Sequence, residues 1–291
     1  MKASIKGVIA AIVTPITTEL RPDHAKLIDL AEQLLANGCD ALNLLGTTGE
    51  ATSFTAEQRS AVMEAAAKRL PLDRLLVGTG ASAVGDAVRL SMKAAELGFS
   101  GVLLLPPFYY KGVSDSGVIG YVGAVVEATQ NEALPIYLYN FPALSGVPYT
   151  ESLVKSLIAR FGSRIAGLKD SSGDLPYARS IAALPERLAV FPSNEGTLIT
   201  ARTGIFAGCI SATVNLNAPL CAKAFYEGDE RALTKAVTIR NLFNGRPLIP
   251  GIKCLVATQR ADSQLAAVMP PLSRLGASDE QSLREQYRSV A

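Results

Sequence analysis

A lysine at the end of an apolar segment is the strongest candidate for chemistry in this chain. Lys169 directly follows the run Ile165–Leu168. Alternate side chains of an extended strand point to the same face. The sequence therefore predicts one shared face for Ile165, Gly167 and Lys169. If that face lies inside the protein, burial disfavours the ammonium and makes a neutral, nucleophilic amine accessible, as Schiff-base chemistry requires. The alternative is a lysine whose stem covers apolar surface while its ammonium reaches water.

Hydroxyl groups follow two other apolar segments. Tyr139 ends one of them, and Thr47 and Thr48 lie in Gly46–Glu50 directly after another. A phenol beside Lys169 could transfer protons, and two hydroxyls with flexible backbone amides could receive a carboxylate. Aromatic rings also fill protein cores, and Gly/Thr clusters are common in loops. These residues therefore support a site only if the fold brings them to the lysine.

The composition narrows the classes of function. Of the 291 residues, 48% are hydrophobic and 19% are charged, which suits a large packed core. The formal charge of +2 is too balanced for an electrostatic nucleic-acid binder. The apolar stretches are interrupted before the roughly 20 residues that a membrane span needs. The segment Met1–Gly7 leads into a strand-like run without a signal-peptide pattern. We therefore expect neither nucleic-acid nor membrane partners.

The histidine and cysteine residues exclude further kinds of site. The one histidine, His24, rules out a metal site built on several histidines and is predicted to be an exposed residue in the first turn of a helix. The four cysteines have no metal-type spacing and lie in apolar contexts: Cys39, Cys209, Cys221 and Cys254. We expect them to be reduced, mostly buried thiols of a cytoplasmic protein. No metal is expected.

Strand-like and helix-like segments alternate through the first three-quarters of the chain. Short apolar runs typical of parallel strands buried on both faces are Val8–Val13, Ala41–Leu45, Leu75–Val77, Gly101–Leu105, Pro135–Tyr139, Ile165–Leu168, Leu188–Phe191 and Phe206–Thr213. The segments between them carry helix signals, such as the capping pattern Thr55–Gln58 and the stop at Gly98. Eight such repeats predict an α/β fold, a (β/α)₈ TIM barrel over residues 1–225. Residues 226–291 are predicted to form a small C-terminal helical region.

Five motifs at the predicted strand ends resemble those of the dihydrodipicolinate synthase / N-acetylneuraminate lyase family. They are Gly46–Glu50, Pro107–Tyr110, Tyr139–Pro142, Gly167–Asp170 and Gly208–Ser211, and they occur in order over nearly the whole chain. The resemblance implies a metal-independent class I lyase without a cofactor. It also implies a homotetramer built as a pair of dimers, acting on a 2-oxo acid, typically pyruvate, and an aldehyde.

The same resemblance implies roles for individual residues. Lys169 would form the Schiff base, and Tyr139 would be the proton relay, assisted by Thr47 and by Tyr109, whose counterpart often reaches into the neighbouring subunit's site. Other residues would bind the substrate: Thr47, Thr48, Gly49, Leu144, Ser171, Asn194, Glu195 and Ile210.

Leu144 marks a departure that bears on the substrate. Dihydrodipicolinate synthases usually have an arginine at this position, where it receives an acidic aldehyde, and leucine cannot make that bidentate contact. Sialic-acid lyases usually have aspartate where Asn194 stands and serine where Thr47 stands. A 2-keto-3-deoxy sugar acid or a related 4-hydroxy-2-oxo acid is therefore the preferred substrate. A dihydrodipicolinate synthase with another cation, an N-acetylneuraminate lyase, a 2-oxo-acid dehydratase and a non-catalytic small-molecule sensor are the alternatives.

Overall fold

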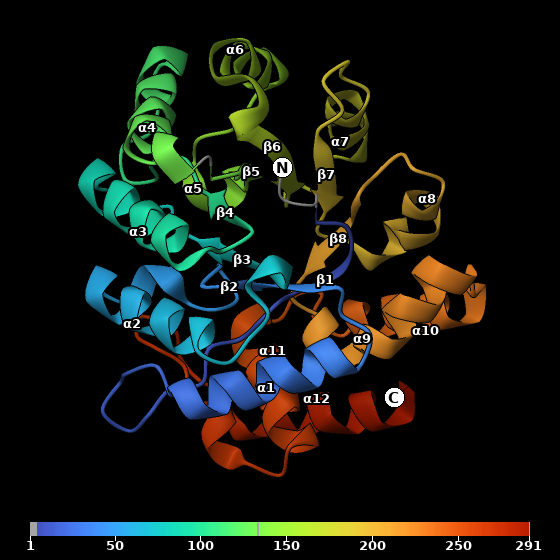
Figure 1. The fold of residues 1–291 in the computed structure, drawn as a ribbon. Helices are drawn as coiled ribbons and strands as arrows, with labels where there is room; N and C mark the ends of the chain where they lie inside the picture. The colour runs from blue at the N-terminus through green and yellow to red at the C-terminus, as the bar shows by residue number, and fades with distance from the viewer. Residues whose placement is uncertain (1–4, 133, 291) are drawn as a thin grey trace.

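A computed structural model describes residues 5–132 and 134–290 of the chain, and its core is a ring of parallel strands (Figure 1). Within these residues, eight strands form one sheet in the order β7-β6-β5-β4-β3-β2-β1-β8. Their bounds are β1 Gly7–Ala11, β2 Ala41–Leu44, β3 Leu75–Gly78, β4 Gly101–Leu104, β5 Ile136–Asn140, β6 Ile165–Asp170, β7 Ala189–Pro192 and β8 Gly208–Ser211. The Ala207 N–H donates to the Val190 carbonyl at 2.9 Å and joins the segment before β8 to β7. The sheet is thus nearly closed, as a (β/α)₈ TIM barrel requires.

The helices form an outer layer around the strands (Figure 1). In the described residues the α-helices are α1 His24–Ala36, α2 Ala56–Ala67, α3 Val84–Leu97, α4 Asp115–Ala128, α5 Pro142–Ser145, α6 Glu151–Phe161, α7 Leu175–Ala182, α8 Leu198–Arg202, α9 Val214–Ala222, α10 Glu230–Asn241, α11 Leu248–Gln259 and α12 Ala277–Val290. Short helical turns are η1 Ala51–Ser53, η2 Leu72–Arg74, η3 Gln130–Glu132, η4 Gly162–Arg164, η5 Glu195–Thr197, η6 Lys223–Glu227 and η7 Ser263–Ala266. The predicted alternation of strands and helices is confirmed.

Local signals set several of these helix ends. Thr55 and Gln58 form the predicted reciprocal capping box at the start of α2. Helix α3 ends where predicted because Gly98 adopts a φ of 89°, a left-handed conformation that favours glycine. His24 is the first residue of α1 and is half-buried. The interpretation of the extreme N-terminus concerns in part residues 1–4, which lie outside the described residues.

The hydrophobic core has two layers. Side chains that point into the barrel form an inner cluster that includes Ile9, Leu103, Tyr137, Phe191 and Ile210. Side chains on the other face of the strands pack against the helices and form a much larger outer cluster. All strands are therefore buried on both faces, which explains why they read as continuous apolar runs.

A bulge in β6 corrects one prediction about which residues share a face. Ile136 pairs with Ile165 but Tyr137 pairs with Gly167, so the register shifts by one residue at Ala166. Ile165 consequently packs in the outer cluster, and the prediction that it shares a face with Lys169 is wrong. An extra residue in one strand reverses the alternation of side chains before it.

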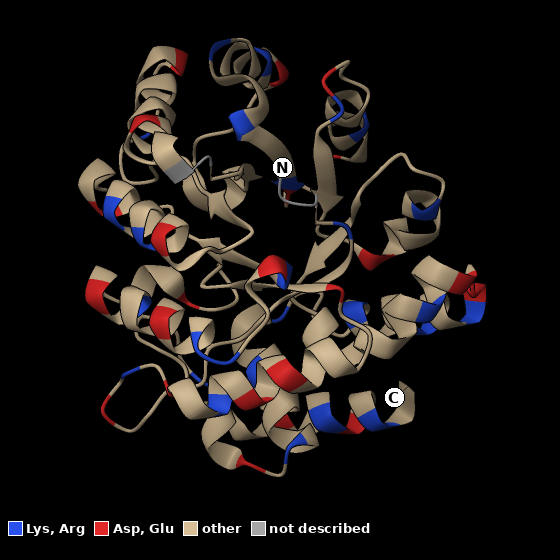
Figure 2. Cartoon of the chain, in the orientation of Figure 1, with Lys and Arg blue, Asp and Glu red and all other residues tan. Residues whose placement is uncertain are grey.

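The C-terminal region packs on the barrel. Arg260, which follows α11, bonds to Asp29 and Gln33 of α1. The boundary at residue 225, just inside η6, stays a prediction. Lys and Arg are interspersed with Asp and Glu over the outer helices (Figure 2). In the described part of the chain, none of the helices has the length and hydropathy of a membrane span.

Candidate active site

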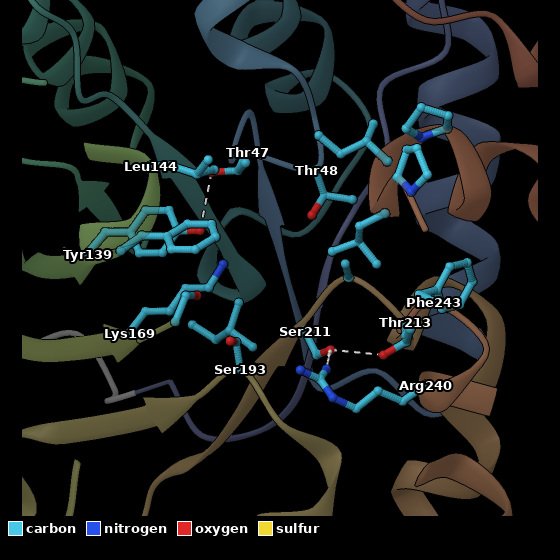
Figure 3. Close-up of a pocket in the computed structure, with 18 of the residues that line it drawn as sticks. Thr47, Thr48, Tyr139, Leu144, Lys169, Ser193, Ser211, Thr213, Arg240 and Phe243 are labelled. Carbon is cyan, nitrogen blue, oxygen red and sulfur yellow. Dashed lines mark hydrogen bonds between the residues drawn. The ribbon is translucent and has the colours of Figure 1, made fainter. Parts of the chain in front are cut away.

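A cavity of about 460 Å³ opens at the carboxyl ends of the strands (Figure 3). Its inner wall contains Thr47 and Thr48, which follow β2, and Lys169 near the end of β6. Ser193, which follows β7, and Ser211, the last residue of β8, also belong to this wall. Parallel strands of a barrel end on one face, so polar residues that are far apart in the sequence meet there.

Lys169, Tyr139 and Thr47 are contiguous in this wall. Pairing of β5 with β6 sets Tyr139 opposite Lys169, and Lys169 Nζ lies 4.3 Å from the centroid of the Tyr139 ring. The Tyr139 hydroxyl and Thr47 Oγ1 share a hydrogen bond of 3.2 Å (Figure 3). Lys169 and Tyr139 are each only 3% exposed. Within the described residues, Lys169 Nζ has no hydrogen-bond or ion-pair partner, so its amine is available to a bound molecule.

The loop Gly46–Gly49, which carries both threonines, is flanked by unusual backbone conformations. Leu45 and Glu50 have φ angles of 52° and 55°, in the left-handed region that non-glycine residues rarely occupy. Thr14 Oγ1 donates to the Gly49 carbonyl at 2.9 Å. A loop in such a conformation persists because surrounding contacts hold it.

One of these contacts is a fully buried ion pair behind the loop. Lys253 Nζ in α11 donates to Glu50 Oε1 at 2.5 Å and to the Thr14 carbonyl at 2.9 Å, and neither charged side chain is exposed. Glu50 Oε2 also accepts the Met269 N–H at 2.6 Å. Burial lowers the pKa of Lys253, and the charge of Glu50 opposes that shift. The C-terminal region thereby fixes the position of the threonine loop.

A second polar cluster holds the ends of β5 and β6. Asp170 points away from Lys169 and accepts from Asn140 Nδ2 at 2.8 Å and from Ser172 Oγ at 2.9 Å. Burial raises the pKa of the Asp170 carboxyl, although these hydrogen bonds oppose the shift. The cluster ties together the strands that carry Tyr139 and Lys169.

At the other side of the cavity, a buried carboxylate holds an arginine. Glu195 is fully buried and accepts from Ser211 Oγ at 2.9 Å, from Thr213 Oγ1 and from Arg240 Nη1 at 3.0 Å. Arg240 Nη1 also donates to Ser211 Oγ at 3.3 Å, as Figure 3 shows. The Arg240 side chain is 34% exposed and lines the cavity.

Most of the residues predicted for the site line this cavity. They are Thr47, Thr48, Tyr139, Leu144, Lys169, Ser171 and Ile210. Gly49, Asn194, Glu195 and Tyr109 do not belong to the lining. Asn194 Oδ1 instead accepts the Gly196 N–H, and Tyr109 is 74% exposed. The structure therefore brings the amine, the phenol and the threonines together, but leaves these four residues outside the cavity wall.

The outer wall of the cavity comes from the C-terminal region and was not predicted from the sequence. Phe243 and Asn244 follow α10, residues 247–250 begin α11, and Leu272 lies before α12. Arg240 was missed for the same reason. The only signal for these residues was the Gly-Arg-Pro break at 245–247, which marks a turn but does not show what it faces.

Comparisons with known proteins agree with this architecture. The model of the Dihydrodipicolinate synthetase family matches residues 4–285. An uncharacterised DapA-like lyase of Chloroflexus aurantiacus is 30% identical over 294 residues, covering 99% of this chain and 98% of that protein. The crystal structure of dihydrodipicolinate synthase from Agrobacterium tumefaciens superposes with a TM-score of 0.91 at 28% identity, covering 98% of this chain and 99% of that one.

A third relative is YagE of Escherichia coli, a putative 2-dehydro-3-deoxy-D-gluconate aldolase. It is 34% identical over 183 residues, which cover 62% of this chain and 58% of YagE. Its crystal structure in complex with pyruvate superposes with a TM-score of 0.88 at 26% identity, covering 99% of each chain. Barrel, cavity and comparisons therefore agree, and the chain is an aldolase-type lyase that belongs to the dihydrodipicolinate synthetase family.

Proposed function

We propose that this protein is a Schiff-base aldolase that joins pyruvate to an aldehyde, or cleaves the product into them. The observation that carries the proposal is the contiguity of Lys169 Nζ, the Tyr139 hydroxyl and Thr47 Oγ1 in one cavity wall. A buried amine beside a phenol–alcohol pair supplies both a nucleophile and a route for protons. YagE, a relative crystallised with pyruvate, supports pyruvate as the 2-oxo acid.

The mechanism in the cleavage direction follows from these positions. Lys169 Nζ attacks the C2 carbonyl of a 4-hydroxy-2-oxo acid, and loss of water from the carbinolamine gives an iminium. Tyr139, hydrogen-bonded to Thr47, donates its proton to the carbinolamine hydroxyl as water leaves. The resulting phenolate then accepts the C4 hydroxyl proton while the C3–C4 electron pair moves into the iminium. The aldehyde leaves, the enamine takes a proton at C3, and water releases pyruvate. The iminium is the electron sink, so the proposed reaction needs no metal or cofactor.

The loop after β2 provides the proposed carboxylate site. Thr47 and Thr48 both line the cavity, and their hydroxyls can donate to the 2-oxo acid's carboxylate. The Ile210 carbonyl, at the end of β8, is proposed to lie near the reacting centre, and Ser171 to contact the substrate chain. Gly49 acts through the backbone of the loop, which Thr14 holds.

The preferred substrate class is a 2-keto-3-deoxy sugar acid. Leu144 lines the cavity and is 61% exposed, so an aldehyde carboxylate finds no cation at that position. Ser193 and Ser211 provide hydroxyl groups along the same cavity, which suits a hydroxylated chain. The name of YagE, a putative 2-dehydro-3-deoxy-D-gluconate aldolase, supports the same class.

Borohydride trapping tests the proposal directly. The protein is incubated with pyruvate, reduced, and analysed by intact mass and peptide mapping. We expect one reduced pyruvyl adduct, on Lys169, and none in Lys169→Ala. Lys155→Ala, which removes an exposed lysine of α6, is the control and should be labelled like the wild type. A folded wild-type protein without an adduct for pyruvate or longer 2-oxo acids would refute the Schiff base and favour a sensor.

Product analysis then separates the reactions that share this imine. An aldolase gives pyruvate and an aldehyde from a 2-keto-3-deoxy sugar acid, whereas a dehydratase keeps the carbon skeleton and loses water. Activity with aspartate semialdehyde as the aldehyde would instead identify a dihydrodipicolinate synthase.

We also propose a homotetramer arranged as two dimers. Tyr109 and Tyr110 are both more than 70% exposed and pack edge to face, with ring centroids 5.3 Å apart. Large exposed aromatic rings are typical of protein interfaces. If Tyr109 assists a neighbouring subunit's site, Tyr109→Ala should lower the molecular mass measured by light scattering and lower activity together. A fully active monomer would contradict this assembly.

A further inference from the structure

The charged side chains that line the cavity are both cations. Among the lining residues they are Lys169 on the strand side and Arg240 on the side of α10 (Figure 3). The proposed reaction uses Lys169 as the nucleophile and assigns no role to Arg240.

The guanidinium of Arg240 is held in place with part of its surface still unused. Nη1 bonds to Glu195 and Ser211, whereas within the described residues Nε and Nη2 have no protein acceptor. Because Glu195 is completely buried and does not line the cavity, a bound molecule meets the guanidinium and not the carboxylate. The free Nε–Nη2 edge is a planar pair of donors, which matches the oxygens of a carboxylate or phosphate.

We propose that Arg240 recognises a second acidic group, so that the favoured aldehyde half of the substrate carries a carboxylate or a phosphate. This inference rests on the proposed function and specifies its substrate class as a sugar acid with an acidic group at each end. One acidic group binds Thr47 and Thr48, C2 reacts with Lys169, and the distal group binds Arg240. Arg240 thus provides from α10 the cation that position 144 lacks.

Glu195 and its hydroxyl partners make this arginine a prepared anion site. Bonds to Glu195 and Ser211 fix Nη1, so little side-chain freedom is lost when the other edge binds. A neutral, hydroxylated aldehyde would gain only ordinary hydrogen bonds there. An acidic aldehyde would gain charge-assisted bonds, which are about twice as strong.

Matched aldehydes provide the test. With pyruvate as the common partner, kcat/KM is measured for glyceraldehyde, for tartronate semialdehyde, which replaces its CH₂OH with a carboxylate, and for glyceraldehyde 3-phosphate. The wild type should prefer at least one acidic aldehyde over glyceraldehyde by about ten- to hundredfold, the range expected for a hydrogen-bonded charged contact. The two acidic compounds show whether carboxylate or phosphate is bound.

Variants then assign that preference to Arg240. Arg240→Gln alone leaves Glu195 buried without a counter-charge and could unfold the protein, so the double variant Arg240→Gln/Glu195→Gln removes both charges. We expect the acidic-to-neutral kcat/KM ratio to fall about ten- to hundredfold in the double variant. In Arg231→Gln, an exposed arginine at the other end of α10, the ratio should stay unchanged.

The trapped pyruvate adduct separates the possible failures. If Lys169 is labelled but the wild type prefers neutral aldehydes, or if the double variant keeps the acidic preference, the role of Arg240 is refuted while the aldolase stands. If no adduct forms at Lys169 in the wild type, the proposed function itself fails, and this inference fails with it.

Discussion

Removing Lys253 tests how the C-terminal region holds the proposed carboxylate-binding loop. Lys253→Met takes away the cation of a pair in which neither side chain is exposed, and leaves Glu50 with the Met269 N–H as its remaining donor. Breaking a buried pair on one side typically costs about 3–5 kcal/mol. Glu50 must also keep its left-handed backbone, which costs a non-glycine residue about 1–2 kcal/mol. We expect the free energy of unfolding to fall by about 3–5 kcal/mol.

Urea unfolding at pH 7 measures this loss, and a double-mutant cycle assigns it. Glu50→Gln keeps an acceptor for the Met269 N–H, so Lys253→Met/Glu50→Gln should lose about 1–3 kcal/mol less than the two single losses added together. Lys155→Met is the matched control, because the Lys155–Glu151 pair is exposed on α6, and it should change stability by no more than about 0.5 kcal/mol.

The loss of stability in Lys253→Met should be accompanied by weaker binding of pyruvate. The left-handed Glu50 directly follows Thr47, Thr48 and Gly49, so loosening Glu50 should raise the KM for pyruvate more than it lowers kcat. A loss of less than about 1 kcal/mol in Lys253→Met, or an additive double variant, would refute the argument that this pair fixes the loop.

Three further predictions follow from the same structure. Tyr139→Phe keeps the ring against Lys169 but loses the hydroxyl, so kcat should fall about 10²–10⁴-fold. Tyr226→Phe, which removes a hydroxyl outside the cavity, is the control and should keep its activity. A fall of less than tenfold in Tyr139→Phe would exclude the proton relay. Burial raises the folded-state pKa of Asp170, so its stabilising contribution is present below the unfolded-state pKa of about 3.9 and is lost as pH rises through the folded value. In urea titrations, the free energy of unfolding of Asp170→Asn should therefore rise relative to that of the wild type between pH 4 and pH 7. The same difference in free energy between the two proteins at both pH values would contradict this prediction. Burial raises the pKa of Cys39 to about 12, and all four cysteines are buried. Ellman's reagent at pH 8 should therefore react rapidly with fewer than one thiol per native chain, and with all four thiols in urea. Rapid labelling of the native protein would contradict this prediction.

Local sequence patterns were sufficient to predict the barrel. Each predicted strand overlaps an observed one, because a strand buried on both faces must be apolar along its length and is bounded by polar turns. Helix ends were predicted equally well where a capping residue or a glycine determines them, as at Thr55 and Gly98. The bulge at Ala166 could not be predicted, since its only trace is one extra residue in the register with β5.

The inner part of the site was also predictable. Lys169, Tyr139 and Thr47 each follow an apolar run, and barrel topology brings the ends of all such runs to one face. The positions of Asn194 and Glu195 were harder to predict from the sequence, because the side chain of a residue that follows a strand can point either into the cavity or behind it. Glu195 turned behind it, where Ser211, Thr213 and Arg240 satisfy its charge.

The sequence by itself determined the fold class and the residues at the strand ends, since both depend on short-range periodicity and a simple topology. Only the tertiary structure decided that Arg240 faces the cavity and that Lys253 holds Glu50. These pairs join residues 45 and 203 positions apart through helices whose own sequences record only which side is apolar. The partner of a charged side chain is chosen by how the C-terminal helices dock on the barrel, and docking depends on the shapes of surfaces that no local pattern contains.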